Sequence, residues 1–324
     1  MPDVICMGEY LVELVSTQPN VSLVQTPGFV KAAGGAPANV AVALERLGMD
    51  AGFIGKVGDD PMGEFLRRSL EQDGVDTSAL LIDPEVRTTV LFNAVWDDGR
   101  KDLCFYRNPG ADMMIREDEI VPEMLANARG FHYGSITFID EPAASAQWKA
   151  LRLARRHGLM ISYDPNYRPT LWPSVERAQS VIREGFRHCH LAKISEEEWE
   201  VATGHKDVEA GLDAVLALGP ELVVLSRGAN GALVTNGAYV LDAPELTVDV
   251  VETTGAGDGF MAAMILRLLP ERERLGSLAQ IEQDVVEEAL HFANAVGALT
   301  CTKPGAIPAL PTLDEVSTFL RTVD

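Results

Sequence analysis

The chain has 324 residues, of which 27 are basic and 48 acidic, so its net charge is −21. A chain of this length can bury a sizeable core in one large domain or two small ones. Its negative charge argues against binding to nucleic-acid phosphates, and the absence of a signal peptide or long apolar run predicts no membrane span. The four scattered cysteines lack metal-ligand spacing, so we expect a cytoplasmic protein without a disulfide framework or zinc site.

The first third of the chain alternates short strands and helices. Residues 4–7 are apolar and predict a buried strand, and the residues up to Val30 predict short strands between turn formers. The pair Gly34-Gly35 leads into a helix that ends at Gly48, because apolar and small residues recur there at helical spacing. Three further elements are expected: a strand at 51–55, a polar loop at 56–60 and an amphipathic helix at 62–71.

The next segment contains the clearest hairpin. Residues 87–96 have strong β character, Asp97-Asp98-Gly99 predicts a turn, and residues 101–107 predict the returning strand.

From about residue 115 onward, buried strands alternate with helices, which predicts a parallel sheet covered by helices on both faces. The strands are expected at 131–134, 159–164, 191–194 and 221–226, and a long helix at 281–300. A proline-rich loop from Asp164 to Trp172 follows the second of these strands, at the end where open α/β sheets bind ligands.

The most informative stretch predicts a strand, a turn of small residues and a helix. Residues 246–251 are β-branched and apolar, and apolar residues recur at helical spacing from Phe260 onward. The first N–H groups of such a helix lack partners, and the small residues Gly255, Ala256 and Gly257 let an anion approach them closely. The turn therefore predicts a phosphate site.

Asp258 follows this turn, although a carboxylate repels an anion. It makes chemical sense as a base that accepts a hydroxyl proton while the neighbouring N–H groups stabilise charge on a transferring phosphoryl group. Two alternatives stay open: a plain tight connection, and a dinucleotide site, whose fingerprint needs glycine in place of Phe260. No P-loop sequence occurs in the chain.

Two segments resemble the signatures of one enzyme family. The stretch from Glu252 to Asp258 resembles the D-T-T-G-A-G-D signature of the ribokinase-like (PfkB) carbohydrate kinases, and the stretch from Gly34 to Ala41 resembles their N-terminal signature. The closest resemblance is to fructokinase and 2-keto-3-deoxygluconate kinase members. It implies an α/β fold, namely a ribokinase-like three-layer αβα sandwich with a mainly parallel central sheet and a small β lid.

The resemblance also implies a division of the chain. The α/β domain that binds nucleotide and sugar would comprise residues 1–9, 34–86 and 108–324, and the β lid would comprise residues 10–33 and 87–107. Exposed edges of lid strands invite pairing, so the resemblance predicts a homodimer formed through the lid.

Catalytic and sugar-binding roles follow from the same resemblance. Asp258 would act as base, and the catalytic set would be completed by Gly255, Ala256, Gly257 and Arg168, whose guanidinium suits phosphate oxygens. The sugar would contact Glu13, Gly34, Gly35, Asn39, Arg107 and Asp258. A solvated Glu13 and a purely structural Arg107 or Arg168 are the alternatives.

The resemblance further implies sites for ATP, magnesium and potassium. ATP would contact Lys193, Ser226, Gly228, Gly231, Gly257 and Asn294. Glu198 would support magnesium through water, although Ser195 and Glu198 also have the spacing of a capping box. A monovalent cation would lie at Glu252, Thr254 and Gly305.

The function predicted from these signatures is an ATP-dependent sugar kinase that transfers the γ-phosphoryl group to a primary hydroxyl, with fructokinase as the first interpretation. Glu13 and Glu252 stand where relatives have aspartate, so 2-keto-3-deoxygluconate kinase, which acts on a sugar acid, is the main alternative. Ribokinase and nucleoside kinase follow. A non-catalytic regulator that binds sugar or nucleotide is disfavoured, because Asp258 and the glycines are all present.

Overall fold

The computed structural model describes residues 1–96, 100–243 and 246–323. Within these residues a nine-stranded sheet has the order β13-β12-β11-β10-β9-β8-β1-β4-β5. All neighbours from β11 to β5 are parallel, and only β12 and β13 are antiparallel to the strands beside them. The strands are β1 (Val4–Met7), β4 (Ala51–Gly58), β5 (Leu80–Asp83), β8 (Gly130–Tyr133), β9 (Met160–Tyr163), β10 (Leu191–Ser195), β11 (Leu222–Ser226), β12 (Ala232–Thr235) and β13 (Val240–Ala243).

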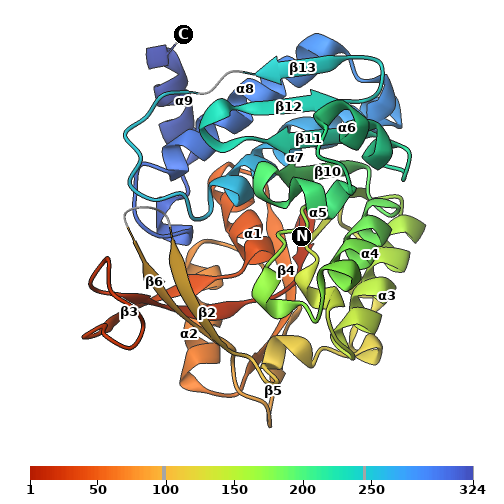
Figure 1. Ribbon diagram of the computed structural model, residues 1–324. Coiled ribbons are helices and arrows are strands. Elements are labelled where there is room, and N and C mark those ends of the chain that lie inside the picture. The colour runs from red at the N-terminus through yellow and green to blue at the C-terminus, as the bar shows by residue number, and fades with distance from the viewer. Residues whose placement is uncertain (97–99, 244–245, 324) are drawn as a thin grey trace.

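Helices cover both faces of this sheet. Since successive residues of a strand point to opposite faces, each strand contributes side chains to two hydrophobic cores. Val4 and Cys6 of β1 belong to one hydrophobic core, with α1 (Ala36–Arg46), α2 (Pro61–Gln72), α7 (Ala256–Leu275), α8 (Gln283–Thr300) and α9 (Leu313–Val323). Ile5 and Met7 belong to the other, with α3 (Ala143–Arg156), α4 (Val175–Phe186), α5 (Trp199–Thr203) and α6 (Val208–Leu216). In Figure 1, α3 and α4 lie together at the right, and α8 and α9 lie at the upper left. The predicted αβα sandwich is confirmed.

A separate four-stranded sheet has the order β3-β2-β6-β7 and lies at the lower left of Figure 1. Its strands are β2 (Leu11–Ser16), β3 (Phe29–Gly34), β6 (Val90–Val95) and β7 (Lys101–Tyr106). The strands β6 and β7 are the two arms of the predicted hairpin. Its predicted turn, Asp97-Asp98-Gly99, lies outside the described residues.

The predicted loop at 56–60 is wrong in its first half, because β4 continues to Gly58. Lys56 lies in this strand with a buried side chain, and its ammonium group lies 2.7 Å from Glu119 and 3.5 Å from Asp83. A lysine usually marks the surface, but here two carboxylates compensate its burial.

The predicted strand at 246–251 is also wrong, since this segment has no regular secondary structure. Val250 and Val251 are 62% and 61% exposed. The N–H groups of Val251 and Glu252 instead both donate to the carbonyl of Cys301, just after α8. The β-branched run therefore serves as an exposed connection to α7, held by one carbonyl rather than by a sheet.

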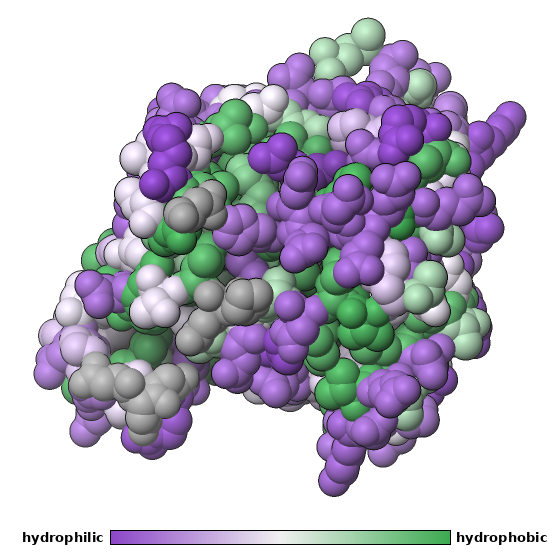
Figure 2. Space-filling model, turned by 90° about the horizontal axis from the view of Figure 1, so that it is seen from above, coloured by the Kyte–Doolittle hydropathy of each residue, from purple (hydrophilic) through white to green (hydrophobic). Residues whose placement is uncertain are grey.

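Hydrophilic residues cover most of the face shown in Figure 2, with smaller hydrophobic patches between them. None of the helices in the described residues is long and apolar enough to cross a membrane.

Candidate active site

The turn before α7 is shaped by glycine. Gly255 has φ of 85°, a left-handed conformation that favours glycine, and a Cβ there would lie 3.1 Å from the Cα of Ala306. A Cβ on Gly257 would lie 3.2 Å from the Nζ atom of Lys193. The turn is therefore packed against backbone on one side and against an ammonium group on the other. Both features suit an anion at the N-terminus of α7.

Asp258 lies buried in the first turn of α7, and its Oδ2 atom accepts a hydrogen bond of 2.8 Å from Nδ2 of Asn39. The pKa of this carboxyl is raised to about 7, mainly by burial and to a lesser extent by the negative charge of Asp164. Asn39, Lys193 and Arg168 act in the opposite direction. A carboxyl group with a pKa near neutrality is suited to accept and release a proton.

Lys193 and Asp164 form a buried ion pair beside this turn. Lys193 lies in β10 and Asp164 directly after β9, and their Nζ and Oδ2 atoms are 2.7 Å apart. Burial by itself lowers the pKa of Lys193, but the carboxylates of Asp164, Glu198 and Asp258 outweigh it and hold this pKa above its usual value. The lysine is therefore protonated and places a positive charge under Gly257.

Glu198 makes the capping contact predicted from the sequence, and its support of magnesium stays a prediction. Its Oε1 atom accepts the N–H of Ser195 at 3.0 Å, as in a capping box, and its Oε2 atom accepts the N–H of Tyr167 at 2.7 Å. The carboxyl is buried, and its pKa is raised by burial and by the charge of Asp164. Glu198 thus fixes the loop that carries Arg168 and adds a second carboxylate beside Asp164.

Arg168 is exposed, and it forms no ion pair with any residue in the described ranges. Its positive charge nevertheless acts on two carboxyl groups, lowering the pKa of Asp258 and of Glu13 relative to what burial alone produces. Among the residues that the structure describes, the guanidinium donates only to the carbonyl of Tyr167 at 3.3 Å and to Oδ1 of Asn166 at 3.5 Å, so its charge is available to a negatively charged ligand.

The predicted sugar-binding residues connect to Asp258 through α1. Gly35 is the N-cap of this helix with φ of 132°, and a Cβ there would collide with the carbonyl oxygen of Glu9. A Cβ on Gly34 would lie 3.5 Å from Oε2 of Glu13, so that carboxylate faces the glycine pair. One turn along α1 is Asn39, the partner of Asp258.

Arg107 is more strongly tied to the protein than the prediction of a sugar contact implies. Its Nε atom lies 2.7 Å from Oδ2 of Asp112, and both side chains are almost fully buried. Asp112 also accepts the hydroxyl of Thr89. Arg107 and its neighbours from Cys104 to Pro109 line an open pocket, so the structural role is present and contact with a ligand in that pocket stays a prediction.

The predicted nucleotide residues lie at the carboxyl ends of the central strands. Ser226 ends β11 and stands opposite Ser195 in the sheet register, and Gly228 and Gly231 form the turn that follows, with φ of 55° and 74°. Asn294 lies in α8, which packs along α7. Direct contacts between these residues and a nucleotide stay a prediction.

Two of the three predicted cation residues, Glu252 and Gly305, meet at the segment after α8. The Oε2 atom of Glu252 accepts the N–H of Gly305 at 2.8 Å. The buried hydroxyl oxygen of Thr254 has no hydrogen-bond partner among the residues that the structure describes. No group of three or more His, Cys, Asp or Glu side chains in residues 1–96, 100–243 and 246–323 could hold a metal ion by itself.

Two site residues were not assigned from the sequence. Asp164 was taken only as the start of a loop, and Glu9 received no role. Glu9 is buried and accepts the N–H of Ala36 at 3.1 Å, so it holds the start of α1 in place of an N-cap side chain. The signal for both is a carboxylate that closely follows the carboxyl end of a fully buried strand.

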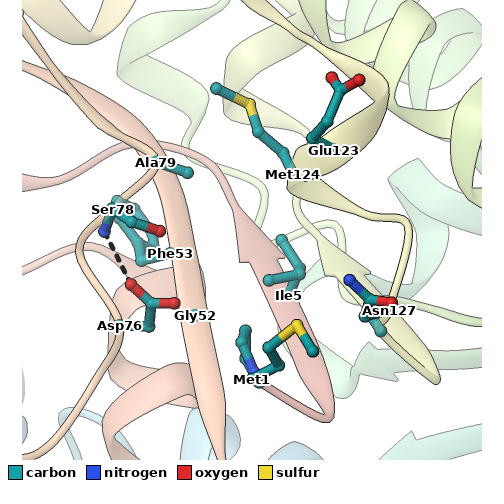
Figure 3. A pocket seen from close by; sticks show the side chains of 12 residues that line it. Met1, Ile5, Gly52, Phe53, Asp76, Ser78, Ala79, Glu123, Met124 and Asn127 are labelled. Carbon is teal, nitrogen blue, oxygen red and sulfur yellow. Dashed lines mark hydrogen bonds between the residues drawn. The ribbon is translucent and has the colours of Figure 1, made fainter.

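A separate cavity of about 180 Å³ lies at the amino ends of the parallel strands, opposite to the end that carries Asp258. Met1, Ile5, Gly52 and Phe53 surround it at the amino ends of β1 and β4, and the N–H of Ser78 donates to Asp76 at its rim (Figure 3). The carboxylates near Asp258 follow the carboxyl ends of the parallel strands, so this cavity is remote from them.

Similar proteins point to one family. Probable fructokinase-4 of Arabidopsis thaliana is 41% identical over 321 residues, which cover 98% of this chain and 96% of the relative. Fructokinase-1 of Oryza sativa subsp. japonica is 42% identical over 316 residues, which cover 97% and 96%.

Solved structures agree with these relatives. The fructokinase of Xylella fastidiosa with bound ATP superposes with a TM-score of 0.91 at 30% identity, covering 100% of this chain and 99% of that one. A Vibrio cholerae fructokinase double mutant with bound fructose, ADP and potassium ion has a TM-score of 0.86 at 31% identity, covering 99% and 98%. Residues 1–313 match the description "pfkB family carbohydrate kinase". The predicted class, an ATP-dependent sugar kinase that phosphorylates an alcohol group, is confirmed, and the chain belongs to the pfkB family of carbohydrate kinases.

Proposed function

We propose that this kinase transfers the γ-phosphoryl group of ATP to a primary hydroxyl of fructose, with Asp258 as the base. The observation that carries this proposal is the environment of Asp258. Its carboxyl is buried at the N-terminus of α7, held by Asn39, and has a pKa of about 7. A group so placed takes the hydroxyl proton as the oxygen attacks phosphorus.

Charge on the phosphoryl group is stabilised from two sides in this proposal. The N–H groups of Gly255 and Gly257 and the ammonium of Lys193 lie at the start of α7, and Arg168 closes the site from the loop after β9. The N–H of Ala256 donates to the carbonyl of Thr253 at 3.2 Å, so it would have to exchange this partner to bind phosphate. The transition state of phosphoryl transfer is loose, so the position of Asp258 matters more than its basicity.

Magnesium fits the carboxylates beside Lys193. Asp164 has a buried Oδ1 atom without a hydrogen-bond partner in the described parts of the chain. Glu198 lies so close to Asp164 that the negative charge of Asp164 raises the pKa of Glu198. Two carboxylates together with nucleotide phosphates are a donor set typical of magnesium. When bound, the ion neutralises phosphate charge; Glu198, whose oxygens already accept two N–H groups, would act through water.

A potassium ion fits the segment around Thr254. The buried hydroxyl of Thr254, the carboxylate of Glu252 and the carbonyl oxygen of Gly305 would supply only oxygen ligands, as an alkali-metal ion requires, while the N–H of Gly305 holds Glu252. Since this segment leads directly into Gly255, an ion there would stabilise the turn that forms the anion site.

The separate sheet is proposed as the lid, comprising residues 10–33 and 87–107, and the remaining residues 1–9, 34–86 and 108–324 as the main domain. Glu13 of the lid faces Gly34, which places the lid beside the sugar-binding end of α1. Phe29 and Tyr106 flank Phe92 on this sheet and are partly or largely exposed, which supports a homodimer formed through the lid. The four free cysteines support a cytoplasmic location.

The test is ATP consumption, measured as ADP release in a coupled assay, with fructose, 2-keto-3-deoxygluconate, ribose and adenosine. Fructose is expected to give the highest kcat/KM. Turnover with the sugar acid alone would contradict the assignment of fructose, and turnover with none of the four while ATP binds would move the substrate to another sugar. Omitting magnesium should abolish the reaction, and replacing potassium by sodium should reduce it.

A further inference from the structure

Asn93 is an unusual residue for its place in the fold. It lies in the middle of β6, whose sequence is Val-Leu-Phe-Asn-Ala-Val, and only 3% of its surface is exposed. Asparagine is disfavoured in strands, and a buried amide is stabilising only when both its ends have partners. A role for the amide group is therefore required to explain this residue.

One end of the Asn93 amide holds Glu13. Its Nδ2 atom donates to Oε1 of Glu13 at 2.6 Å. The two residues lie on neighbouring parallel strands, where Glu13 stands opposite Leu91 and Val15 opposite Asn93. The contact thus crosses the sheet diagonally and fixes the long glutamate side chain in one orientation.

The other end of the amide has no such partner. The Oδ1 atom of Asn93 is buried and accepts no hydrogen bond from any residue in the described ranges. An acceptor left in this state costs roughly 1–3 kcal/mol. The same is true of Oδ1 of Asn39, the amide that holds Asp258. Each carboxylate is therefore held by an asparagine whose carbonyl oxygen is open to a further donor.

Glu13 belongs to the same site as Asp258. Its Oε2 atom faces Gly34, and Gly34 and Gly35 lead into the helix that carries Asn39. Arg168 acts electrostatically on both Glu13 and Asp258, and Glu252 acts on Glu13. The pair formed by Glu13 and Asn93 therefore borders the pocket on the lid side, while Asp258 borders it on the side of α7.

We propose that Asn93 is a specificity-determining residue, which positions Glu13 and offers its free carbonyl oxygen to a hydroxyl group of the sugar at the end away from the phosphorylated one. This inference rests on the proposed function of a sugar kinase with Asp258 as base. The carboxylate of Glu13 and the carbonyl of Asn93 are both hydrogen-bond acceptors. Together they select a hydrogen-bond donor, which in a sugar is a neutral hydroxyl group. A substrate carboxylate at this point would be repelled, and a deoxy carbon would leave both acceptors unpaired.

The first experiment compares Asn93→Val with the wild-type kinase on the best sugar in the four-substrate assay. Valine suits a strand and removes both ends of the amide. The KM for the sugar is expected to rise about tenfold or more, because the lost contact stabilises the bound sugar and the transition state equally. The kcat and the KM for ATP should change by less than about threefold. Val95→Ala, a truncation on the same strand and face, should leave all three constants unchanged.

Discrimination against deoxy sugars gives a readout that a structural role would not move. The ratio of kcat/KM for the sugar to that for each monodeoxy analogue should fall in Asn93→Val at one carbon and stay unchanged at the others. If the ratio is unchanged at every carbon, Asn93 does not recognise a hydroxyl and the inference is overturned.

A double-mutant cycle tests the positioning of Glu13. Glu13→Asp shortens the side chain by one methylene and breaks the contact with Asn93, so adding Asn93→Val to it should cost less than it does in the wild type, because only the contact of the Asn93 carbonyl with the sugar is then lost. Glu13→Gln keeps the length and an acceptor, so Asn93→Val should retain most of its effect in that background. Additive effects in both backgrounds would overturn the coupling.

The outcomes separate this inference from the proposed function. If fructose is inactive but another sugar is phosphorylated, only the assignment of fructose fails, and the cycle is run with that sugar. If Asn93→Val melts at a much lower temperature than the wild type, Asn93→Thr, which retains a hydroxyl and suits a strand, replaces it. An unchanged KM for the sugar in a folded variant contradicts the role of Asn93 whichever sugar is used.

Discussion

Asn39 donates a hydrogen bond to Asp258 across 2.8 Å, although 219 positions separate the two residues in the chain. The contact joins the first turns of α1 and α7, which are packed against each other on one face of the main sheet. Each helix begins at a glycine with a positive φ, Gly35 in α1 and Gly255 in α7. The relationship thus fixes the proposed base with respect to the proposed sugar pocket.

Replacement of the base is the most direct prediction. Asp258→Asn should lower kcat by at least about a hundredfold, since a general base typically contributes this much. The asparagine can still accept the hydrogen bond from Asn39, so sugar binding measured by calorimetry should change little. Near-normal turnover of this variant would contradict the assignment of Asp258.

The pH dependence should follow the same carboxyl group. Burial is the main cause that raises the pKa of Asp258 to about 7, and the base form predominates only above that value. The kcat/KM for the sugar should therefore fall about tenfold per unit below about pH 7 and level off above it.

Asn39→Ala should move this acid limb to higher pH, because the hydrogen bond from Asn39 favours the ionised carboxyl. The readout is the pH at which kcat/KM begins to fall, and not the maximum of kcat/KM. The maximum will be lower in any case, because the variant also loses a proposed sugar contact. A limb that stays in place would show that another group controls it.

How far the sequence predicted this site depends on the range of the contacts. The residues from Gly255 to Asp258 were identified because small residues before a helix have a local physical meaning, whereas Asn39 was identified because its segment resembles a family signature. The pairing of Lys193 with Asp164 was not predicted, because it depends on which strands become neighbours. Composition alone does not specify that order.

The two errors in the fold have a similar origin. Lys56 looked like a loop residue, and only the positions of Glu119 and Asp83 allow it to lie buried in β4. The run at 246–251 looked like a strand, but its N–H groups find the carbonyl of Cys301 instead of a neighbouring strand. In both cases a partner far along the chain overrides the local pattern.

The buried pair of Lys193 and Asp164 should respond asymmetrically to mutation. Lys193→Met leaves the carboxylate of Asp164 buried and unpaired, and we expect a loss of roughly 3–5 kcal/mol in the free energy of unfolding, measured with urea. Adding Asp164→Asn removes the orphaned charge and should restore part of this loss. Equal stability of the single variant and the wild type would show that the pair is not buried in solution.

The proposed cation segment can be tested with a matched pair of threonines. Thr254→Val removes a buried hydroxyl oxygen, whereas Thr253→Val changes its exposed neighbour. If the ion binds there, the potassium concentration for half-maximal activity should rise several-fold in Thr254→Val only, at constant ionic strength. The same shift in both variants, or in neither, would contradict a potassium site at Thr254.

Asp258 should also make the protein less stable at high pH. The unfolded chain releases this proton near pH 3.8, the folded protein only near pH 7, so the free energy of unfolding falls between these values and stays low above them. Three pKa units correspond to about 4 kcal/mol. Asp258→Asn avoids this penalty, so its melting temperature should exceed that of the wild type at pH 8, by a margin that shrinks toward pH 5. Asp213→Asn, an exposed change in α6, should show no such pH-dependent margin. If Asp258→Asn behaved like this control, the carboxyl would already be ionised at low cost in the folded protein, and the acid limb of the activity would have to arise from a different group.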